Sequence, residues 1–150
     1  MTQRTAGILL HPTSLPGPHG SGDLGEPARR FADFLTAAEH RWWQMLPIGP
    51  IGAGNSPYSS ASAFAGGWHL SDLTQLVKDK LLSPGEFEPL RARRVDKVHY
   101  PSALRYRHQQ LRRAFERFQR SRRRRTEYER FCEENREWLD DYTLFRALKD

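Results

Sequence analysis

The sequence lacks the features of secreted and membrane proteins. Its single cysteine, Cys132, excludes a disulfide within the chain and fits a reducing compartment. No apolar stretch approaches the roughly 20 residues that span a bilayer, and the short apolar run near the N-terminus is too short for a signal-peptide core. We therefore expect a soluble cytoplasmic protein without a membrane partner.

Core-forming side chains are also scarce. Hydrophobic residues make up 37% of the 150 residues and charged residues 28%, although four Trp, five Tyr and eight Phe argue against a disordered chain. Residues 1–72 carry a net charge of −1 and hold ten of the eleven glycines, whereas residues 73–150 carry +7, which gives the total of +6. The chain therefore divides into a loop-rich first half and a charged second half of helical composition.

The first half predicts a strand, a helix and a second strand. Residues 5–10 and 41–46 are short apolar segments that indicate buried strands, and helical spacing of apolar residues runs from Glu26 to about Ala38 between them. Such a unit builds parallel sheets or barrels. Because ligands gather at the carboxyl ends of parallel strands, we expect a site where the loops 11–25 and 47–67 begin.

The second of these loops has an unusual composition. Residues 47–66 are almost entirely Gly, Pro, Ser, Ala and Asn, with Tyr58 and Phe64 as the bulky side chains. Small residues let a ligand approach the backbone, and a tyrosine offers a flat apolar face with a hydroxyl group. This combination suits a sugar ring, so we expect a ligand-binding loop here.

The second half predicts helices. A short helix at 73–83 is followed by residues 95–100, which are ambiguous. A long helix begins at Ser102, with Leu104, Leu111, Phe115 and Phe118 near helical spacing. A further helical run extends from Tyr128 to Leu148.

The arginine run Arg120–Arg125 suggests an alternative function. Clustered arginines can release counterions on binding nucleic acid, so a nucleic-acid-binding module is one hypothesis. The run has no interleaved aromatic residues, and the acidic segment after it could partly neutralise it. We therefore favour a solvated helix end or an interhelical loop.

Catalytic, metal and cofactor motifs are weak. Asp140 and Asp141 are adjacent on a predicted helix and point about 100° apart, so they cannot easily face one substrate. His11 and His19 have no cysteine or carboxylate at ligand spacing, so we expect no metal site. The glycine clusters lack the spacing of nucleotide-binding loops, and we expect no cofactor.

Three segments together resemble the amylomaltase, or disproportionating-enzyme, family of 4-alpha-glucanotransferases. They are GILLHPTSLPGPHGSGDLG at 7–25, WWQMLPIGPIGAGNSPYSSASAFAG at 42–66 and WLDDYTLFRALKD at 138–150. The resemblance implies an α/β fold, the N-terminal part of a (β/α)8 TIM barrel of the α-amylase superfamily, followed by a largely helical insertion. Residues 1–75 would be the first β-α-β portion of the barrel, with the substrate-binding loops. Residues 76–150 would be a helical subdomain truncated at its C-terminus.

The resemblance also implies an activity. Family members transfer segments of α-1,4-glucans such as maltooligosaccharides, starch or glycogen to the 4-hydroxyl of an acceptor glucan, with retention through a covalent intermediate. The family's catalytic aspartates and glutamate lie beyond the matched segments, and a barrel needs roughly 250 residues. We therefore expect no catalytic residue in this chain, no activity of the isolated chain, and a truncated reading frame or partial gene.

The resemblance carries over to individual residues. Ser56 and Tyr58 match family residues that line the sugar subsites at the cleavage point, with Tyr58 as the stacking platform. His11 and Ser14 match the first-strand loop, which shapes the site. Trp68 is a further candidate sugar platform, although an aromatic residue at this position more often packs. Ala53 replaces an aromatic residue that in some relatives contributes to a second glucan site, so we do not expect that site.

Two alternatives remain open beside the enzyme interpretation. One is a non-catalytic glycan-binding remnant, and the other is the arginine-rich nucleic-acid module. A separate structural question is whether the chain folds alone, because an incomplete barrel leaves sheet edges and helix faces uncovered.

Overall fold

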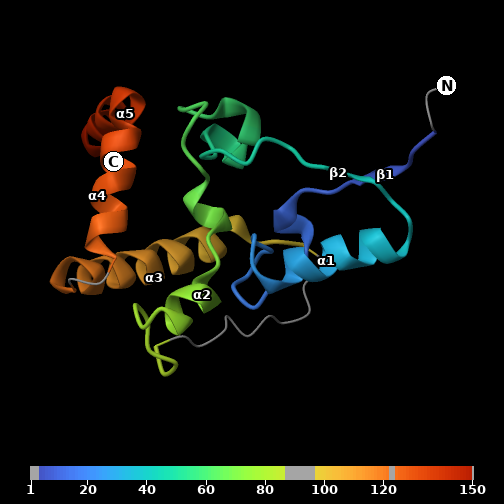
Figure 1. Cartoon of the computed structure of the whole chain (residues 1–150), viewed down its shortest axis with the longest axis horizontal. Coiled ribbons are helices and arrows are strands. Elements are labelled where there is room, and N and C mark those ends of the chain that lie inside the picture. The colour runs from blue at the N-terminus through green and yellow to red at the C-terminus, as the bar shows by residue number, and fades with distance from the viewer. Residues whose placement is uncertain (1–3, 87–96, 122–123, 150) are drawn as a thin grey trace.

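The computed structural model describes residues 4–86, 97–121 and 124–149. The regular elements in these ranges are β1 (Gly7–Leu9), α1 (Glu26–Ala37), β2 (Trp42–Gln44), α2 (Leu73–Lys78), α3 (Tyr100–Arg120), α4 (Arg125–Glu134) and α5 (Arg136–Lys149). Four short 3-10 helices lie in the connecting loops, at Pro12–Ser14, Ala53–Asn55, Pro57–Ser59 and Trp68–Leu70. The two strands and the pair α4–α5 lie at opposite ends of the molecule (Figure 1).

The predicted strand–helix–strand unit is confirmed. β1 pairs in parallel with β2, from Gly7 opposite Trp42 to Leu9 opposite Gln44, and α1 supplies the crossover that parallel strands require. Gly7 allows the close approach of the strands, because a Cβ atom there would lie 2.5 Å from the Trp42 carbonyl oxygen.

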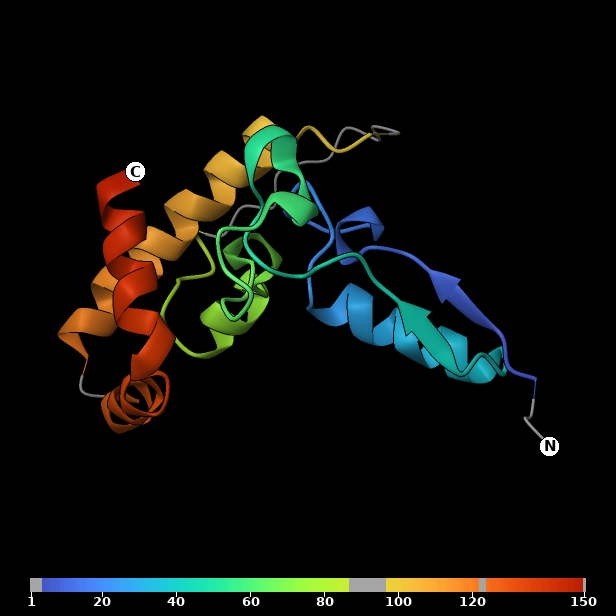
Figure 2. The ribbon, with the colours of Figure 1, turned by 90° about the horizontal axis from the view of Figure 1, so that it is seen from above.

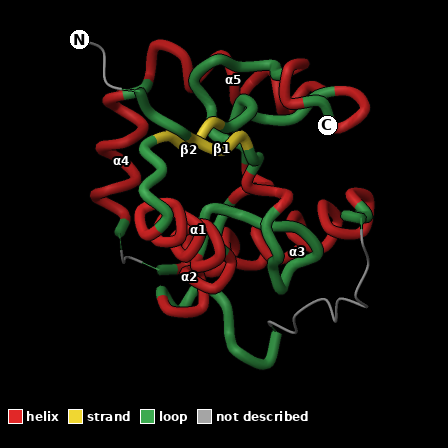
Figure 3. The backbone as a smooth tube through the Cα atoms, turned by 90° about the vertical axis from the view of Figure 1, so that its right-hand side faces the viewer, coloured by secondary structure: helices red, strands yellow, loops and turns green. Residues whose placement is uncertain are grey.

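The expectation that these strands are buried is wrong. Leu9 is 59% exposed and Trp42 is 64% exposed, and each strand has three residues. One face is covered by α1, where the Phe31 ring packs edge-on against Trp43 with a centroid distance of 4.9 Å. In Figure 3 the helices α1, α2 and α3 lie on one side of the strands, and the exposure of Leu9 and Trp42 shows that the side chains on the face away from α1 remain in contact with solvent.

Helix α3 begins at Tyr100, two residues before the predicted start, and its buried face differs from the predicted apolar one. Its buried residues are Ala103, Arg107, Gln110 and Ala114, whereas Phe115 is 51% exposed. The small alanine side chains let neighbouring loops pack close to α3. The Arg107 guanidinium forms hydrogen bonds with polar groups of these loops. Of the ambiguous segment 95–100, the first two residues lie outside the described ranges.

The predicted helical run from Tyr128 to Leu148 is two helices that meet at Asn135. At the end of α4 the Phe131 carbonyl accepts hydrogen bonds from both the Asn135 backbone amide, at 3.1 Å, and the Asn135 side-chain amide, at 2.8 Å. The Asn135 side-chain oxygen accepts a hydrogen bond from the Trp138 indole nitrogen at 3.1 Å. Asn135 therefore ends one helix and orients a side chain in the first turn of the next.

Candidate functional site

The loop that follows β2 is closed at its base. The Gly67 amide donates to the Ile48 carbonyl at 2.8 Å, so the two ends of the loop lie side by side. Further out, the Gly52 amide donates to the Ser56 carbonyl at 3.0 Å around a turn in which Gly54 has a φ of 66°. The segment is therefore a closed, internally bonded loop, a type that is frequently functional.

Ser56 and Tyr58 lie near the middle of this loop. The Ser56 hydroxyl oxygen accepts a hydrogen bond from the Tyr58 amide at 3.3 Å and caps the 3-10 helix Pro57–Ser59. Tyr58 is 72% exposed. Ser56 thus fixes the backbone from which the tyrosine ring is presented to solvent.

His11 and Ser14 occupy the loop after β1. The His11 Nδ1 atom is hydrogen-bonded to the Thr13 hydroxyl at 2.8 Å, and this hydroxyl is in turn 3.1 Å from the Tyr100 hydroxyl of α3. Burial lowers the pKa of His11, against an opposing effect of the Pro47 backbone at the start of the second loop. Ser14 is exposed. His11 therefore lies where the two loops meet, with Ser14 available at the surface.

Trp68 is half-buried at the end of the second loop. Its indole makes edge contacts with the rings of His69 and His108, at centroid distances of 6.1 and 5.8 Å. These contacts give the side chain a packing role against α3.

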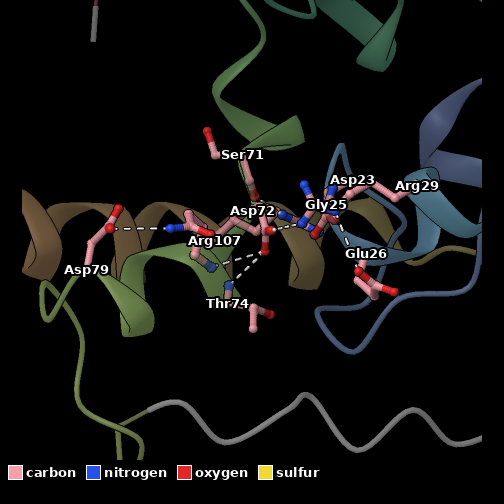
Figure 4. Close-up of polar contacts among 10 residues, drawn as sticks. Asp23, Gly25, Glu26, Arg29, Ser71, Asp72, Thr74, Asp79 and Arg107 are labelled. Atoms are coloured by element: carbon pink, nitrogen blue, oxygen red, sulfur yellow. Dashed lines mark hydrogen bonds and ion pairs between the residues drawn. The ribbon is translucent and has the colours of Figure 1, made fainter.

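A buried ion pair, which the sequence analysis did not predict, joins α3 to both loops. The Arg107 guanidinium donates to an Asp23 carboxylate oxygen at 2.9 Å and to the Ser71 carbonyl at 3.0 Å (Figure 4). It also donates to the Ser21 carbonyl at 3.0 Å. The arginine side chain is 0% exposed and that of Asp23 is 3% exposed. The other Asp23 oxygen accepts a hydrogen bond from the Gly25 amide at 2.9 Å. One side chain thus connects the loop after β1 with the segment that leaves the second loop.

Two buried histidines lie around this arginine. His19 is 1% exposed and stacks on Tyr106 of α3, and His69 is 2% exposed. The pKa of His19 is lowered to about 4 by burial and then by Arg107, which outweigh the nearby carboxylates. The pKa of His69 is also lowered to about 4, by burial and then by His11 and Arg107. Both rings are therefore neutral near pH 7.

Carboxylates near the loops serve the fold. Besides Asp23, Asp72 accepts hydrogen bonds at the first turn of α2 and pairs with Arg29 of α1 at 3.1 Å. Asp140 and Asp141 are exposed on α5. The described part of the chain contains no group of three or more His, Cys, Asp or Glu side chains placed to hold a metal ion. It also contains no helix long and apolar enough to cross a membrane.

Two arginines of the run Arg120–Arg125 form ion pairs with acidic side chains that the structure describes. Arg124 contacts Asp79, just after α2, at 3.1 Å, and Arg125 pairs with Glu129 one turn along α4 at 3.3 Å. Arg122 and Arg123 lie outside the described residues. Near this run, a cavity of about 360 Å³ lies between α3 and α4, with Phe115, Phe118 and Tyr128 among its lining residues. None of the predicted sugar-binding residues lines this cavity.

Comparison with known proteins decides the family. A family model described as 4-alpha-glucanotransferase matches residues 10–150. The chain belongs to this family. A 4-alpha-glucanotransferase of Synechocystis is 41% identical over 100% of this chain and 30% of the relative. That of Thermus thermophilus is 45% identical over 97% of this chain and 29% of the relative.

The three-dimensional comparison agrees with the family assignment. The amylomaltase from Streptococcus agalactiae, solved in complex with acarbose, matches with a TM-score of 0.86 at 33% identity and covers 98% of this chain. The match covers 30% of that amylomaltase chain. The chain therefore spans about 30% of the length of the relatives it matches. The resemblance seen in the three sequence segments is confirmed.

Proposed function

We propose that this chain carries glucan-binding loops of a 4-alpha-glucanotransferase. Such an enzyme transfers α-1,4-glucan segments to the 4-hydroxyl of an acceptor glucan by a retaining double displacement. The observation that carries the proposal is the closed loop after β2, which presents Tyr58 with 72% of its surface exposed. Family membership over residues 10–150 supports it.

In this proposal each candidate residue has a distinct task. Tyr58 stacks on a sugar ring of a maltooligosaccharide, starch or glycogen chain. The Ser56 hydroxyl oxygen holds the Tyr58 backbone amide and can also accept a hydrogen bond from a sugar hydroxyl. His11 and Ser14 shape the adjoining surface. Trp68 offers a further aromatic surface to the sugar chain, and its contacts with the rings of His69 and His108 hold its indole in place.

The proposal extends to architecture and partners. Residues 1–75 would form the first β-α-β portion of a (β/α)8 barrel and residues 76–150 a helical subdomain, which the parallel pairing of β1 and β2 and the helices that follow support. We assign the arginine run to a solvated helix end rather than a nucleic-acid site, because Arg124 and Arg125 already have acidic partners. We propose a cytoplasmic location and no cofactor.

The isolated 150-residue chain is expected to have no disproportionating activity. Retaining glycoside chemistry needs two carboxyl groups about 5–5.5 Å apart across the scissile bond. Asp23 and Asp72, close to the loops, are held in ion pairs with Arg107 and Arg29. Incubation with maltotriose should release no glucose above a blank, whereas the Thermus thermophilus relative serves as the positive control. Glucose release by the purified chain would contradict the prediction.

The Tyr58→Ala change tests the proposed binding site. Loss of the aromatic platform should weaken maltoheptaose binding roughly tenfold, since an aromatic contact contributes on the order of 1 kcal/mol beyond its buried area. Tyr58→Phe should retain most of the affinity because it keeps the ring. Tyr128→Ala, at a 49% exposed tyrosine on α4, is the matched control and should bind as the wild type does. Calorimetric titration measures all four proteins, and equal affinities would refute the role of Tyr58.

A further inference from the structure

We infer that stacking of Phe64 on Trp138 of α5 positions the closed loop after β2, and with it Tyr58, for glucan binding. The inference rests on the proposed function and names the positioning contact of the same site. It assigns the helical second half of the chain a part in glucan binding.

The contact joins the loop to a helix that is distant in sequence. The rings of Phe64 and Trp138 are nearly parallel, with a centroid distance of 5.9 Å and an interplanar angle of 24°. Phe64 is nevertheless 72% exposed, so its side chain is not part of the core. The loop and α5 lie side by side in both perpendicular views (Figures 1 and 2). An aromatic ring that is mostly exposed yet stacked on one partner suits an anchor better than a core residue.

Both sides of the stack are held in place. On the loop, the Ser62 hydroxyl oxygen accepts hydrogen bonds from the Phe64 and Ala65 amides at 3.1 and 3.0 Å, which fixes the backbone that carries the ring. On the helix, the Trp138 indole donates to the Asn135 side chain at 3.1 Å and contacts the Tyr142 ring at a centroid distance of 6.3 Å. The stack therefore connects two locally rigid segments.

The rest of the loop explains why an anchor is needed. β2 ends at Gln44, and the base of the loop is closed by the hydrogen bond between Gly67 and Ile48. Beyond this base the loop is built of small residues and contributes no fully buried side chain between Ile51 and Gly66. Tyr58 precedes Phe64 by six residues within the same closed segment. The hydrogen bonds seen within residues 52–65 join only close neighbours in sequence, so the Phe64 stack links the outer part of the loop to a distant element.

Hydrogen exchange of the 150-residue chain, measured without glucan, tests the anchor itself. Phe64→Ala and Trp138→Ala should each increase amide exchange in residues 49–66, while exchange in α1 and α3 stays unchanged. Phe64→Tyr and Trp138→Phe keep an aromatic pair and should therefore retain the wild-type protection of the amides in residues 49–66. Phe115→Ala, at a 51% exposed phenylalanine on α3, is the matched control. Unchanged exchange in 49–66 for both alanine variants would overturn the inference.

Maltoheptaose titration tests the consequence for binding. Each alanine variant should raise the dissociation constant about three- to tenfold, and the double variant should raise it no further, because both changes break one contact. If Phe64→Ala weakens binding while Trp138→Ala does not, Phe64 contacts the glucan directly and the positioning role is wrong. If the wild type does not bind maltoheptaose, the proposed function fails and the glucan role fails with it. In that case the exchange experiment still decides whether the stack holds the loop.

Discussion

Replacement of Arg107 by methionine is expected to lower the free energy of unfolding by about 3–5 kcal/mol. The change leaves the Asp23 carboxylate buried without its counter-charge and removes the donors to the Ser21 and Ser71 carbonyls. Urea denaturation followed by circular dichroism measures the effect. The loss comes from stranding a charge and two carbonyl groups, not from the intrinsic strength of the ion pair.

Two further variants separate this explanation from a general effect on α3. Arg105→Met alters an exposed arginine on the same helix and should change stability by less than about 0.5 kcal/mol. The double variant Arg107→Met, Asp23→Leu removes both charges and should be more stable than Arg107→Met alone. If Arg107→Met unfolds within about 1 kcal/mol of the wild type, Arg107 does not join the loops to α3 as described.

Acidification from pH 7 to pH 5 is expected to lower the free energy of unfolding by roughly 2 kcal/mol for each of His19 and His69. Their pKa values of about 4 in the folded chain lie below the ordinary value of 6.5 because both rings are buried near Arg107. Between pH 6.5 and 4 the unfolded chain binds more protons, so stability falls as pH falls through this window. The pKa of Glu86 is lowered to about 2 by hydrogen bonds from Ser83 and Arg117, so its contribution is lost at lower pH.

Urea denaturation at several pH values measures this dependence. His69→Gln should flatten the curve between pH 7 and pH 5. Equal stability of the wild type at pH 7 and pH 5 would contradict the burial of the two neutral rings. A slope that His69→Gln does not alter would assign the dependence to other groups.

The parts of the fold that the sequence predicts are those set by local patterns. The apolar runs around Ile8 and Trp43, with a helical segment between them, specify the parallel β-α-β unit without knowledge of the rest of the chain. The exposure of Leu9 and Trp42 could not be predicted in this way, because burial depends on which elements cover each face. The break at Asn135 was missed because the apolar spacing continues through it.

In the candidate site, too, the features set by nearby residues can be predicted from the sequence, whereas the contacts between distant residues cannot. The composition of the loop after β2 indicates a ligand-binding segment, and the exposed Tyr58 within it follows from neighbours close in sequence. The ion pair of Arg107 with Asp23 spans 84 positions, and the Phe64–Trp138 stack joins the loop to a different helix. A one-dimensional pattern does not encode such contacts. The helical phase of Arg107 with Ala103 and Ala114 is the one signal that could have indicated a buried arginine.

The most direct test of the central claim is a map of maltoheptaose binding by hydrogen exchange on the 150-residue chain. The account predicts that glucan slows amide exchange in residues 52–60, around Tyr58, and that Tyr58→Ala abolishes this protection. Residues lining the cavity between α3 and α4 should exchange at the same rate with and without glucan. Absence of protection in 52–60, or protection confined to α3 and α4, would contradict the assignment of the loop as a glucan-binding site.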